Sequence, residues 1–204
     1  MTLAAWLSLF AICLVGAMSP GPSLAMVVKH SLAGGRKNGL ATAWAHSAGI
    51  GVYAFLTLFG LAVVLHHSPW LFNSLSIIGA LYLAYLGINA IRSKGGVAEK
   101  LQSGEPVSVW QSAKEGLLIA LLNPKIAIFF IALFSQFVGE GHGWGSRLLI
   151  VLIPIAVDGL WYSIITLMVS HPSFIAKIRS KARLIDRVSG VILVLLALRV
   201  VFTI

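Results

Sequence analysis

Charged residues are scarce in this chain, and acidic ones are the scarcest. Charged residues make up 10% of the 204 positions, with six Asp and Glu against 15 Lys and Arg, whereas soluble domains average about 25%. Residues 38–91 contain no Asp, Glu, Lys or Arg at all. That run exceeds two membrane spans of about 20 residues each. With 58% hydrophobic residues and a mean hydropathy of +0.94, the composition predicts a membrane protein.

Several groups that carry chemistry are missing as well. The sequence has no Gly-rich phosphate loop, no twin carboxylates and no Cys/His metal spacing, and no pair of nucleophile and base is visible. Cys13 is the single cysteine, so an internal disulfide is excluded, and we interpret it as a small apolar filler. We therefore expect no enzymatic activity, no cofactor and no bound metal.

The net charge of +9 is distributed between the hydrophobic stretches and does not form a separate basic patch. Such a distribution follows the positive-inside rule, so we expect lipid and not nucleic acid as the partner. Both termini are then predicted to face outward, with three basic loops in the cytoplasm. These loops contain Lys29, Arg36 and Lys37; Arg92, Lys94 and Lys100; and Lys177, Arg179, Lys181, Arg183 and Arg187.

The hydrophobic pattern predicts an all-α, polytopic fold in one transmembrane domain covering residues 1–204. No positive region precedes the first hydrophobic stretch, so we expect an uncleaved span and no signal peptide. Six membrane-spanning helices are expected, at about 3–18 resuming at 22–33, 38–65, 69–91, 112–138, 146–170 and 185–203.

Two of these spans carry a proline motif, and the two motifs lie half a chain length apart. Ser19-Pro20-Gly21-Pro22 interrupts the first span and Asn123-Pro124-Lys125 the fourth. Proline removes a backbone donor and clashes with the preceding turn, so each motif should break its helix. Three spans per half imply that the halves insert in opposite directions, as inverted repeats of about 1–93 and 112–204 joined by a loop at about 92–111. Paired breaks of this kind indicate a transporter with its site near the midplane.

Ionisable residues inside the spans are the candidate functional groups, because burying a charge there is costly. Asp158 is the only acid near the middle of a span and suits either reversible protonation or capture of an ammonium group. Lys125 follows the second break and can meet a substrate carboxylate, as can the free amides after Pro22. His46 can relay protons, since histidine titrates near neutral pH.

Structural interpretations remain open for each of these residues. Asp158 can instead form an ion pair with Lys125 or Arg199, and Lys125 can extend towards an interface. His46 can be a hydrogen-bonded packing residue. Trp161 and Tyr162 can contact a substrate side chain or simply fill the core of the membrane domain.

At these positions the chain resembles the LysE/RhtB family of bacterial amino-acid exporters, and its homoserine/threonine-efflux branch in particular. The resemblance extends over nearly the whole chain. The matching segments are Ser19-Pro20-Gly21-Pro22-Ser23, Gly39 with His46, Gly49 and Tyr53, Gly79-Ala80-Leu81-Tyr82-Leu83, Asn123-Pro124-Lys125, Asp158 with Trp161-Tyr162, and Asp186-Arg187-Val188-Ser189-Gly190.

The resemblance implies efflux of small neutral amino acids across the bacterial inner membrane, driven by the proton motive force, often by a homo-oligomer such as a homodimer. Two alternatives remain: a metal-cation permease, and a membrane structural or assembly protein. We predict proton coupling at Asp158 and His46. The predicted substrate-binding residues are Pro20, Gly21, Pro22, Ser23, Asn123, Pro124, Lys125, Asp158, Trp161 and Tyr162.

Overall fold

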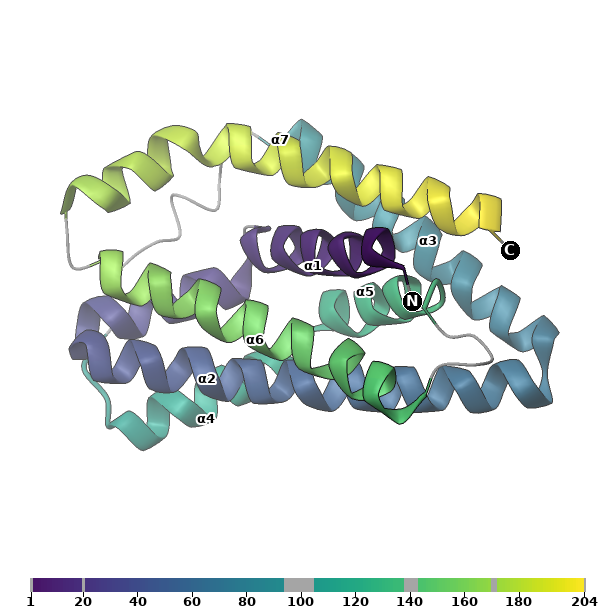
Figure 1. Ribbon diagram of the computed structural model, residues 1–204. Helices are drawn as coiled ribbons and strands as arrows, with labels where there is room; N and C mark the ends of the chain where they lie inside the picture. Colours follow the sequence, from purple (N-terminus) through teal and green to yellow (C-terminus); the bar gives the residue numbers. More distant parts are fainter. Residues whose placement is uncertain (1, 20, 94–104, 138–142, 170–171, 204) are drawn as a thin grey trace.

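The protein is described here from a computed structural model, which covers residues 2–19, 21–93, 105–137, 143–169 and 172–203. Within these ranges the chain is entirely α-helical, as predicted (Figure 1). The helices are α1 (Leu3–Met18), α2 (Pro22–His67), α3 (Pro69–Arg92), α4 (Val109–Leu121), α5 (Pro124–Phe134), α6 (Trp144–Val169) and α7 (Pro172–Thr203).

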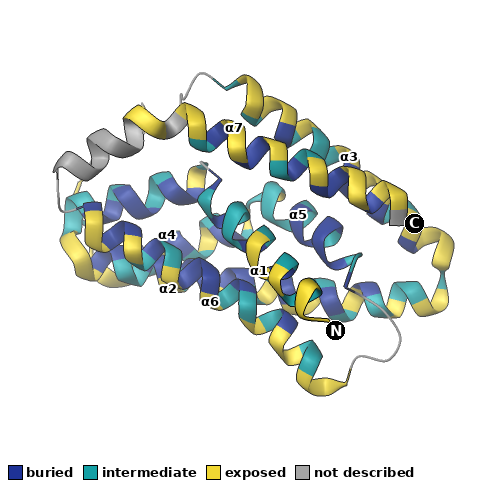
Figure 2. Cartoon of the chain, turned by 45° about the horizontal axis from the view of Figure 1, so that its top comes forward, coloured by how far each residue is buried: buried dark blue, intermediate teal, exposed yellow. Residues whose placement is uncertain are grey.

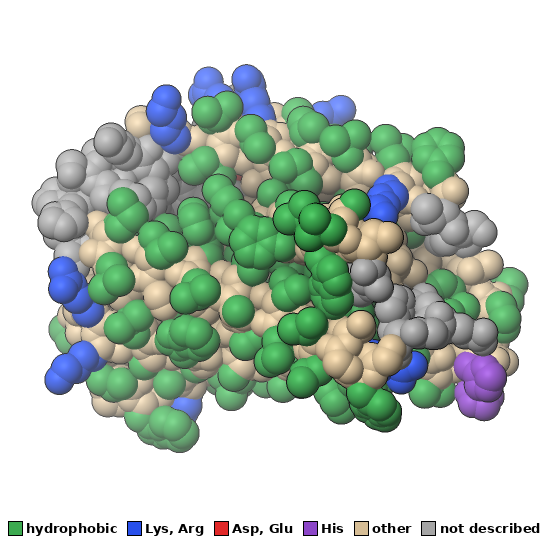
Figure 3. All heavy atoms as spheres, viewed as in Figure 1, with side chains coloured by type: hydrophobic (Ala, Val, Ile, Leu, Met, Phe, Trp, Pro, Cys, Tyr) green, Lys and Arg blue, Asp and Glu red, His purple; other side chains and the backbone are tan. Residues whose placement is uncertain are grey.

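The outside of the molecule is apolar, which is the reverse of a soluble protein. Large hydrophobic side chains such as Phe55, Leu81 and Phe202 are exposed, and on the face in Figure 3 they cover most of the surface, with Lys and Arg mainly near its edges. The buried positions lie on the inward faces of the helices (Figure 2). An apolar patch this extensive marks a surface that contacts lipid. Helices suit that environment because they satisfy their own backbone hydrogen bonds.

Helix α2 is two arms that fold back on each other. Its backbone leaves the helical conformation at Gly35, where φ is 74°, a value that glycine adopts without steric cost. On a straight helix Ser23 and His46 would be about 35 Å apart, yet Ser23 Oγ lies 2.9 Å from His46 Nε2. The predicted spans at 22–33 and 38–65 are therefore the two arms of α2.

The last helix begins earlier than the sequence predicted. We expected a basic loop before a span at 185–203, but α7 already starts at Pro172. The segment that we took for a loop is rich in Lys and Arg, and these residues are good helix formers. The basic loop is thus a helical extension of the last apolar segment.

Length and apolarity identify fewer spans than the six expected. Among the described residues, three helices can cross a membrane, namely α2, α3 and α6, and a fourth span is formed if the bent pair α4 and α5 counts as one. Helix α1 is apolar but only 16 residues long. The structure therefore supports a multi-pass helical membrane protein, while the six-span count remains a prediction.

Short half-helices fill the centre of the fold. Helices α1 and α5 lie between the α3/α7 pair and the layer formed by α2, α4 and α6 (Figure 1). Glycines allow the longer helices to touch: a Cβ at Gly116 would collide with the backbone of Thr42, and a Cβ at Gly87 or Gly190 would collide with the backbone of the other. Small residues at such contacts are the usual basis of helix packing in lipid.

A polar cluster formed by Lys29, His30, Asn38, Ser112 and Glu115 ties α2 to α4. His30 is fully buried, and its ring nitrogens lie 3.0 Å from Glu115 Oε2 and 3.2 Å from Ser112 Oγ. Lys29 Nζ lies 3.4 Å from the same carboxylate oxygen, and Asn38 donates to Ser112 Oγ at 2.9 Å. These bonds hold both arms of α2 against α4.

The break between α4 and α5 has its backbone groups satisfied by side chains. The two helices meet at 54°. Asn123 caps α5 by accepting a hydrogen bond from the backbone N–H of Lys125 at 3.1 Å, so that this N–H does not bond the carbonyl of Leu121 four residues earlier. The Leu121 carbonyl instead accepts a hydrogen bond from the hydroxyl of Tyr53 at 2.6 Å.

Removing that hydroxyl should weaken the fold. We predict that Tyr53→Phe lowers the free energy of unfolding by about 1–3 kcal/mol, because it leaves a part-buried carbonyl without a donor. The measurement is the thermal unfolding midpoint of the purified protein in detergent. Tyr85→Phe, at an exposed position of α3, is the matched control and should leave the midpoint unchanged. Equal midpoints for Tyr53→Phe and wild type would show that Tyr53 does not stabilise the break.

Candidate functional site

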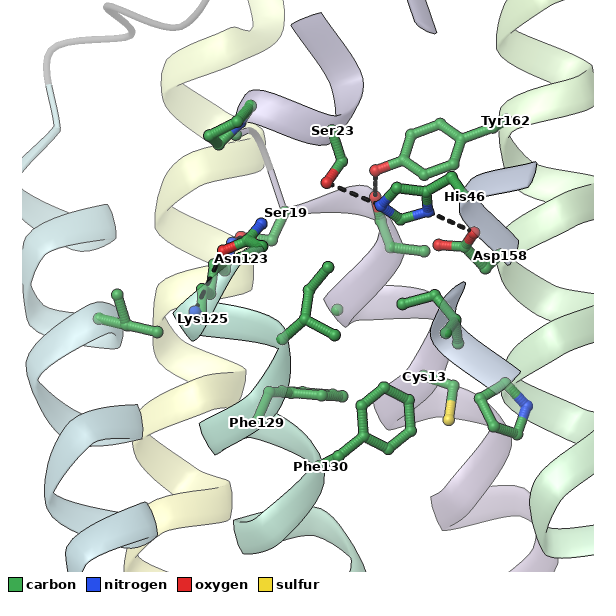
Figure 4. A pocket seen from close by; sticks show the side chains of 18 of the residues that line it. Cys13, Ser19, Ser23, His46, Asn123, Lys125, Phe129, Phe130, Asp158 and Tyr162 are labelled. Atoms are coloured by element: carbon green, nitrogen blue, oxygen red, sulfur yellow. Dashed lines mark hydrogen bonds and ion pairs between the residues drawn. The ribbon is translucent and has the colours of Figure 1, made fainter. Parts of the chain in front are cut away.

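The two predicted breaks meet at a cavity. Ser19 at the end of α1 and Lys125 at the start of α5 are joined by a hydrogen bond of 2.7 Å from Nζ to Oγ, and both line a cavity of about 60 Å³ (Figure 4). The lining residues come from α1, both arms of α2, α3, α5, α6, α7 and the two breaks. They are Cys13, Gly16, Ala17, Ser19, Gly21, Pro22, Ser23, His46, Ile50, Leu86, Asn123, Lys125, Ile126, Phe129, Phe130, Pro154, Asp158, Tyr162 and Leu193.

Positive charge is concentrated on one side of the cavity. A Cβ at Gly21 would lie 3.9 Å from Lys125 Nζ, so the ammonium group lies beside the N-terminus of α2. Gly21 is the N-cap of that helix and has no side chain with which to cap it. The free amides and the positive end of the helix dipole add to the charge of Lys125. This side of the cavity can receive an anion.

A hydrogen-bonded chain of three side chains forms another wall. His46 Nδ1 lies 2.8 Å from Asp158 Oδ2 and His46 Nε2 lies 2.9 Å from Ser23 Oγ. Figure 4 shows the imidazole ring between the other two groups. His46 is 2% exposed and Asp158 is 5% exposed, so the bonds compete little with water. Because an ionised carboxylate can only accept, the neutral imidazole must then donate from Nδ1 to Asp158, and Nε2 accepts from the Ser23 hydroxyl.

Tyr162 supports this chain from the side. Its ring packs edge-on against that of His46, with centroids 5.3 Å apart, and its hydroxyl donates to the Ala17 carbonyl at 3.3 Å. The second bond connects α6 to the last turn of α1, directly before the first break. The orientation of the imidazole is therefore set by groups on α1, α2 and α6.

The structure brings most of the predicted site residues together. Gly21, Pro22, Ser23, His46, Asn123, Lys125, Asp158 and Tyr162 all line the cavity. Among the described residues, Asp158 is paired with His46 and makes no ion pair with Lys125. Pro20 lies outside the described residues.

Two predicted residues lie elsewhere. Trp161 packs against an apolar cluster that includes Leu24, Val27 and Val28, and it does not line the cavity. Pro124 is exposed at the start of α5, where its fixed φ begins the half-helix. The placement of Trp161 matches its packing interpretation.

Sequence reasoning missed the apolar part of the lining. Cys13 was interpreted as filler, and Gly16, Phe129 and Phe130 were not singled out, yet all four line the cavity. A signal was present: Phe129 follows Lys125 by four residues, and Gly16 follows Cys13 by three. In a helix such spacings place residues near one face. Applying helical spacing outward from each break would have identified them.

Comparison with known proteins agrees with this geometry. Residues 14–203 match the family described as LysE type translocator. The threonine efflux protein of Escherichia coli K12 is 29% identical over 184 residues, which is 87% of each chain. An uncharacterized membrane protein of Pseudomonas aeruginosa is 35% identical over 140 residues, covering 65% of this chain and 63% of that protein. No solved structure matches. The family match covers nearly the entire chain, so this protein belongs to the LysE type translocators.

Proposed function

We propose that the protein exports a small neutral amino acid of the homoserine/threonine type, or a derivative, from the cytoplasm in exchange for protons. Family members are translocators and not enzymes, and a relative covering 87% of the chain is named a threonine efflux protein. The observation that carries the proposal is the buried cavity between the two breaks, which holds Lys125 on one side and Asp158 on another. A zwitterion offers the complementary pair of charges.

An inverted repeat is the architecture that best accounts for where the cavity lies. Helix α1 with the first arm of α2 would form the broken span of one repeat, and α4 with α5 that of the other. Their breaks meet at Ser19 and Lys125. In Figure 1, α1 and α5 lie near each other and run in opposite directions. Repeats inserted in opposite senses would allow one bundle to rock against the other around the cavity.

The carboxylate of the substrate would bind at the break in the first span. Lys125 would contribute a charge-assisted hydrogen bond, and the amides at the start of α2 would contribute the rest. Ser19, which now accepts from Lys125 at 2.7 Å, would release the ammonium group when the substrate arrives. Substrate binding would therefore exchange one hydrogen bond for another and would not leave a charge exposed.

The proton would be carried by His46 and Asp158. A proton arriving from outside would be taken up by this pair, which shares a 2.8 Å hydrogen bond, and it would compete with the substrate ammonium group for the Asp158 carboxylate. Protonation of the pair would change the hydrogen bond between His46 and Ser23, and Ser23 lies on the first arm of α2. One charge moved through 100 mV supplies about 2.3 kcal/mol, which is sufficient to drive uphill export.

Orientation follows from the charge of the connections. The basic segments at the α2 turn and at the start of α7 would face the cytoplasm of a bacterial inner membrane, and both termini would face outward as one transmembrane domain. The termini lie towards the same end of the molecule in Figure 1. The lipid-facing surface also has room for a second copy, and a homodimer remains a proposal.

A metal-cation permease has less support. Within the part of the chain that the structure describes, no group of three or more His, Cys, Asp or Glu side chains could hold a metal ion. The cavity contains one carboxylate beside a lysine, and a lysine repels cations. A purely structural role would leave the matched breaks and the cavity between them without a purpose.

Asp158→Asn tests the proton coupling. The amide keeps the shape of the carboxyl group but cannot take up a proton. We expect that proteoliposomes with this variant lose pH-driven accumulation of threonine by at least 10-fold and keep normal membrane insertion. Exchange of labelled for unlabelled threonine separates the two proposed roles: it survives if Asp158 only carries the proton, and it is lost if Asp158 also binds the ammonium group. Wild-type accumulation by Asp158→Asn would remove Asp158 from the mechanism.

Lys125→Met tests the carboxylate site. Loss of one charge-assisted hydrogen bond costs about 1.5–3 kcal/mol, so we expect the apparent affinity for threonine to fall roughly 10- to 100-fold. Affinity for threonine amide, which has no carboxylate, should change little. Lys114→Met makes the same substitution at an exposed position of α4 and should leave both affinities unaltered. Equal losses for the acid and the amide would mean that Lys125 does not contact the carboxylate.

A further inference from the structure

One wall of the cavity is almost entirely hydrocarbon, and the functions proposed above do not use it. We call this wall the apolar subsite and define it as Cys13, Gly16, Ile50, Ile126, Phe129 and Phe130. In Figure 4, Cys13, Phe129 and Phe130 lie at one end of the cavity, and Ser19, Ser23 and His46 lie at the other. The cavity therefore has a polar end and an apolar end.

We infer that the apolar subsite receives the side chain of the substrate, and that the preferred substrates are amino acids with an apolar, branched side chain such as valine. The inference rests on the proposed function, because it takes the polar end of the cavity as the place where the amino and carboxylate groups bind. It keeps the small neutral class but changes its preferred members, from hydroxylated amino acids of the homoserine/threonine type to apolar ones of similar size.

The first argument is the absence of a hydrogen-bonding partner within the subsite. Its one polar side-chain group is the thiol of Cys13, which is 5% exposed and is a weak donor and acceptor. The hydroxyl groups of Ser19 and Ser23 lie at the polar end of the cavity, away from the subsite (Figure 4), and Ser23 is bonded to His46. A threonine hydroxyl buried here would lose its hydrogen bonds to water without replacement, whereas a methyl group would lose nothing.

The second argument is the packing that fixes the shape of the subsite. The Phe129 and Phe130 rings meet edge to face with centroids 5.6 Å apart, and Phe130 packs on Phe134 at 5.2 Å. Phe130 is 2% exposed and Phe134 is fully buried. Phe130 is therefore held in place by the rings on both sides of it, and Phe129 packs against a fixed neighbour.

Gly16 sets how far the Phe129 ring extends into the cavity. A Cβ at position 16 would lie 2.8 Å from Phe129 Cζ, which is closer than van der Waals contact allows. The ring now occupies the space that a larger residue would fill. In a Gly16→Ala variant the ring must shift, and because the ring lines the cavity the subsite changes shape and loses room for the larger side chains.

Valine and threonine are the natural pair of probes, because they have the same shape and differ by a methyl and a hydroxyl group. A hydrophobic pocket discriminates against an added hydroxyl by no more than about 100-fold. We therefore expect valine to bind about 10- to 100-fold more tightly than threonine. A polar subsite would produce the opposite order.

The test is competition for counterflow of labelled alanine in proteoliposomes containing the full-length protein. Alanine has too short a side chain to reach far into the subsite, so it reports transport itself. Valine should inhibit at concentrations about 10- to 100-fold below those of threonine. Gly16→Ala should weaken inhibition by leucine at least 10-fold more than it weakens inhibition by unlabelled alanine, because only the longer side chain reaches the displaced Phe129 ring. Gly60→Ala, where a Cβ meets nothing within 4 Å, is the matched control and should behave as wild type.

A second variant changes the polarity of the subsite without changing its size. Cys13→Ser places a hydroxyl within it and should reduce the preference for valine over threonine several-fold. The inference is overturned if threonine inhibits the wild type as well as valine does, or if Cys13→Ser leaves the preference for valine unchanged. In either case, alanine counterflow would still support amino-acid transport. Absence of counterflow for alanine and for every competitor would instead refute the proposed function, and the inference with it.

Discussion

A helix that breaks within an apolar environment must have its free backbone groups satisfied by other parts of the protein, and this requirement organises the whole structure. Asn123 caps the start of α5, and Tyr53 donates to the carbonyl of Leu121 from a different helix. At the other break, Ser19 accepts a hydrogen bond from Lys125. The two breaks are thus joined by a hydrogen bond between their side chains. Because polar groups must gather wherever helices are broken, the polar cavity is a direct consequence of placing the breaks together.

The same requirement explains why the charged groups of the cavity can respond to a substrate. His46 bonds Ser23 on the first arm of α2 and Asp158 on α6, so the position of the imidazole depends on how these elements pack. In the proposed cycle, a substrate in the cavity would alter the hydrogen bonds of Lys125 or Asp158, and these bonds connect separate helices. Chemistry at the site and rearrangement of the helices are therefore linked by the same few side chains. A conformational change needs such differential contacts in order to be driven by a ligand.

Much of the fold could be read from the sequence because membrane segments obey simple physical limits. The breaks at Gly21-Pro22 and Asn123-Pro124 follow from the covalent structure of proline, and the turn between the arms of α2 follows from Gly35, where φ is 74°. The predicted start of the last helix was wrong because a run of Lys and Arg is compatible both with a basic loop and with a helix that extends beyond the membrane. Trp161 does not line the cavity, although it packs against the same apolar cluster as Tyr162. Which of these two adjacent rings reaches the cavity depends on how α6 packs against the first arm of α2.

By itself, the sequence determined the membrane environment, the helical class and the places where helices must break, because each depends on residues that are neighbours in the chain. It also identified Asp158, Lys125 and His46, since a charge or an imidazole within an apolar segment is costly wherever it lies. Only the tertiary structure decided which of these groups bond one another and that Cys13 and Phe129 complete the cavity. Those contacts join α1, α2, α5 and α6, and the distance between side chains on separate helices depends on packing and not on position in the chain.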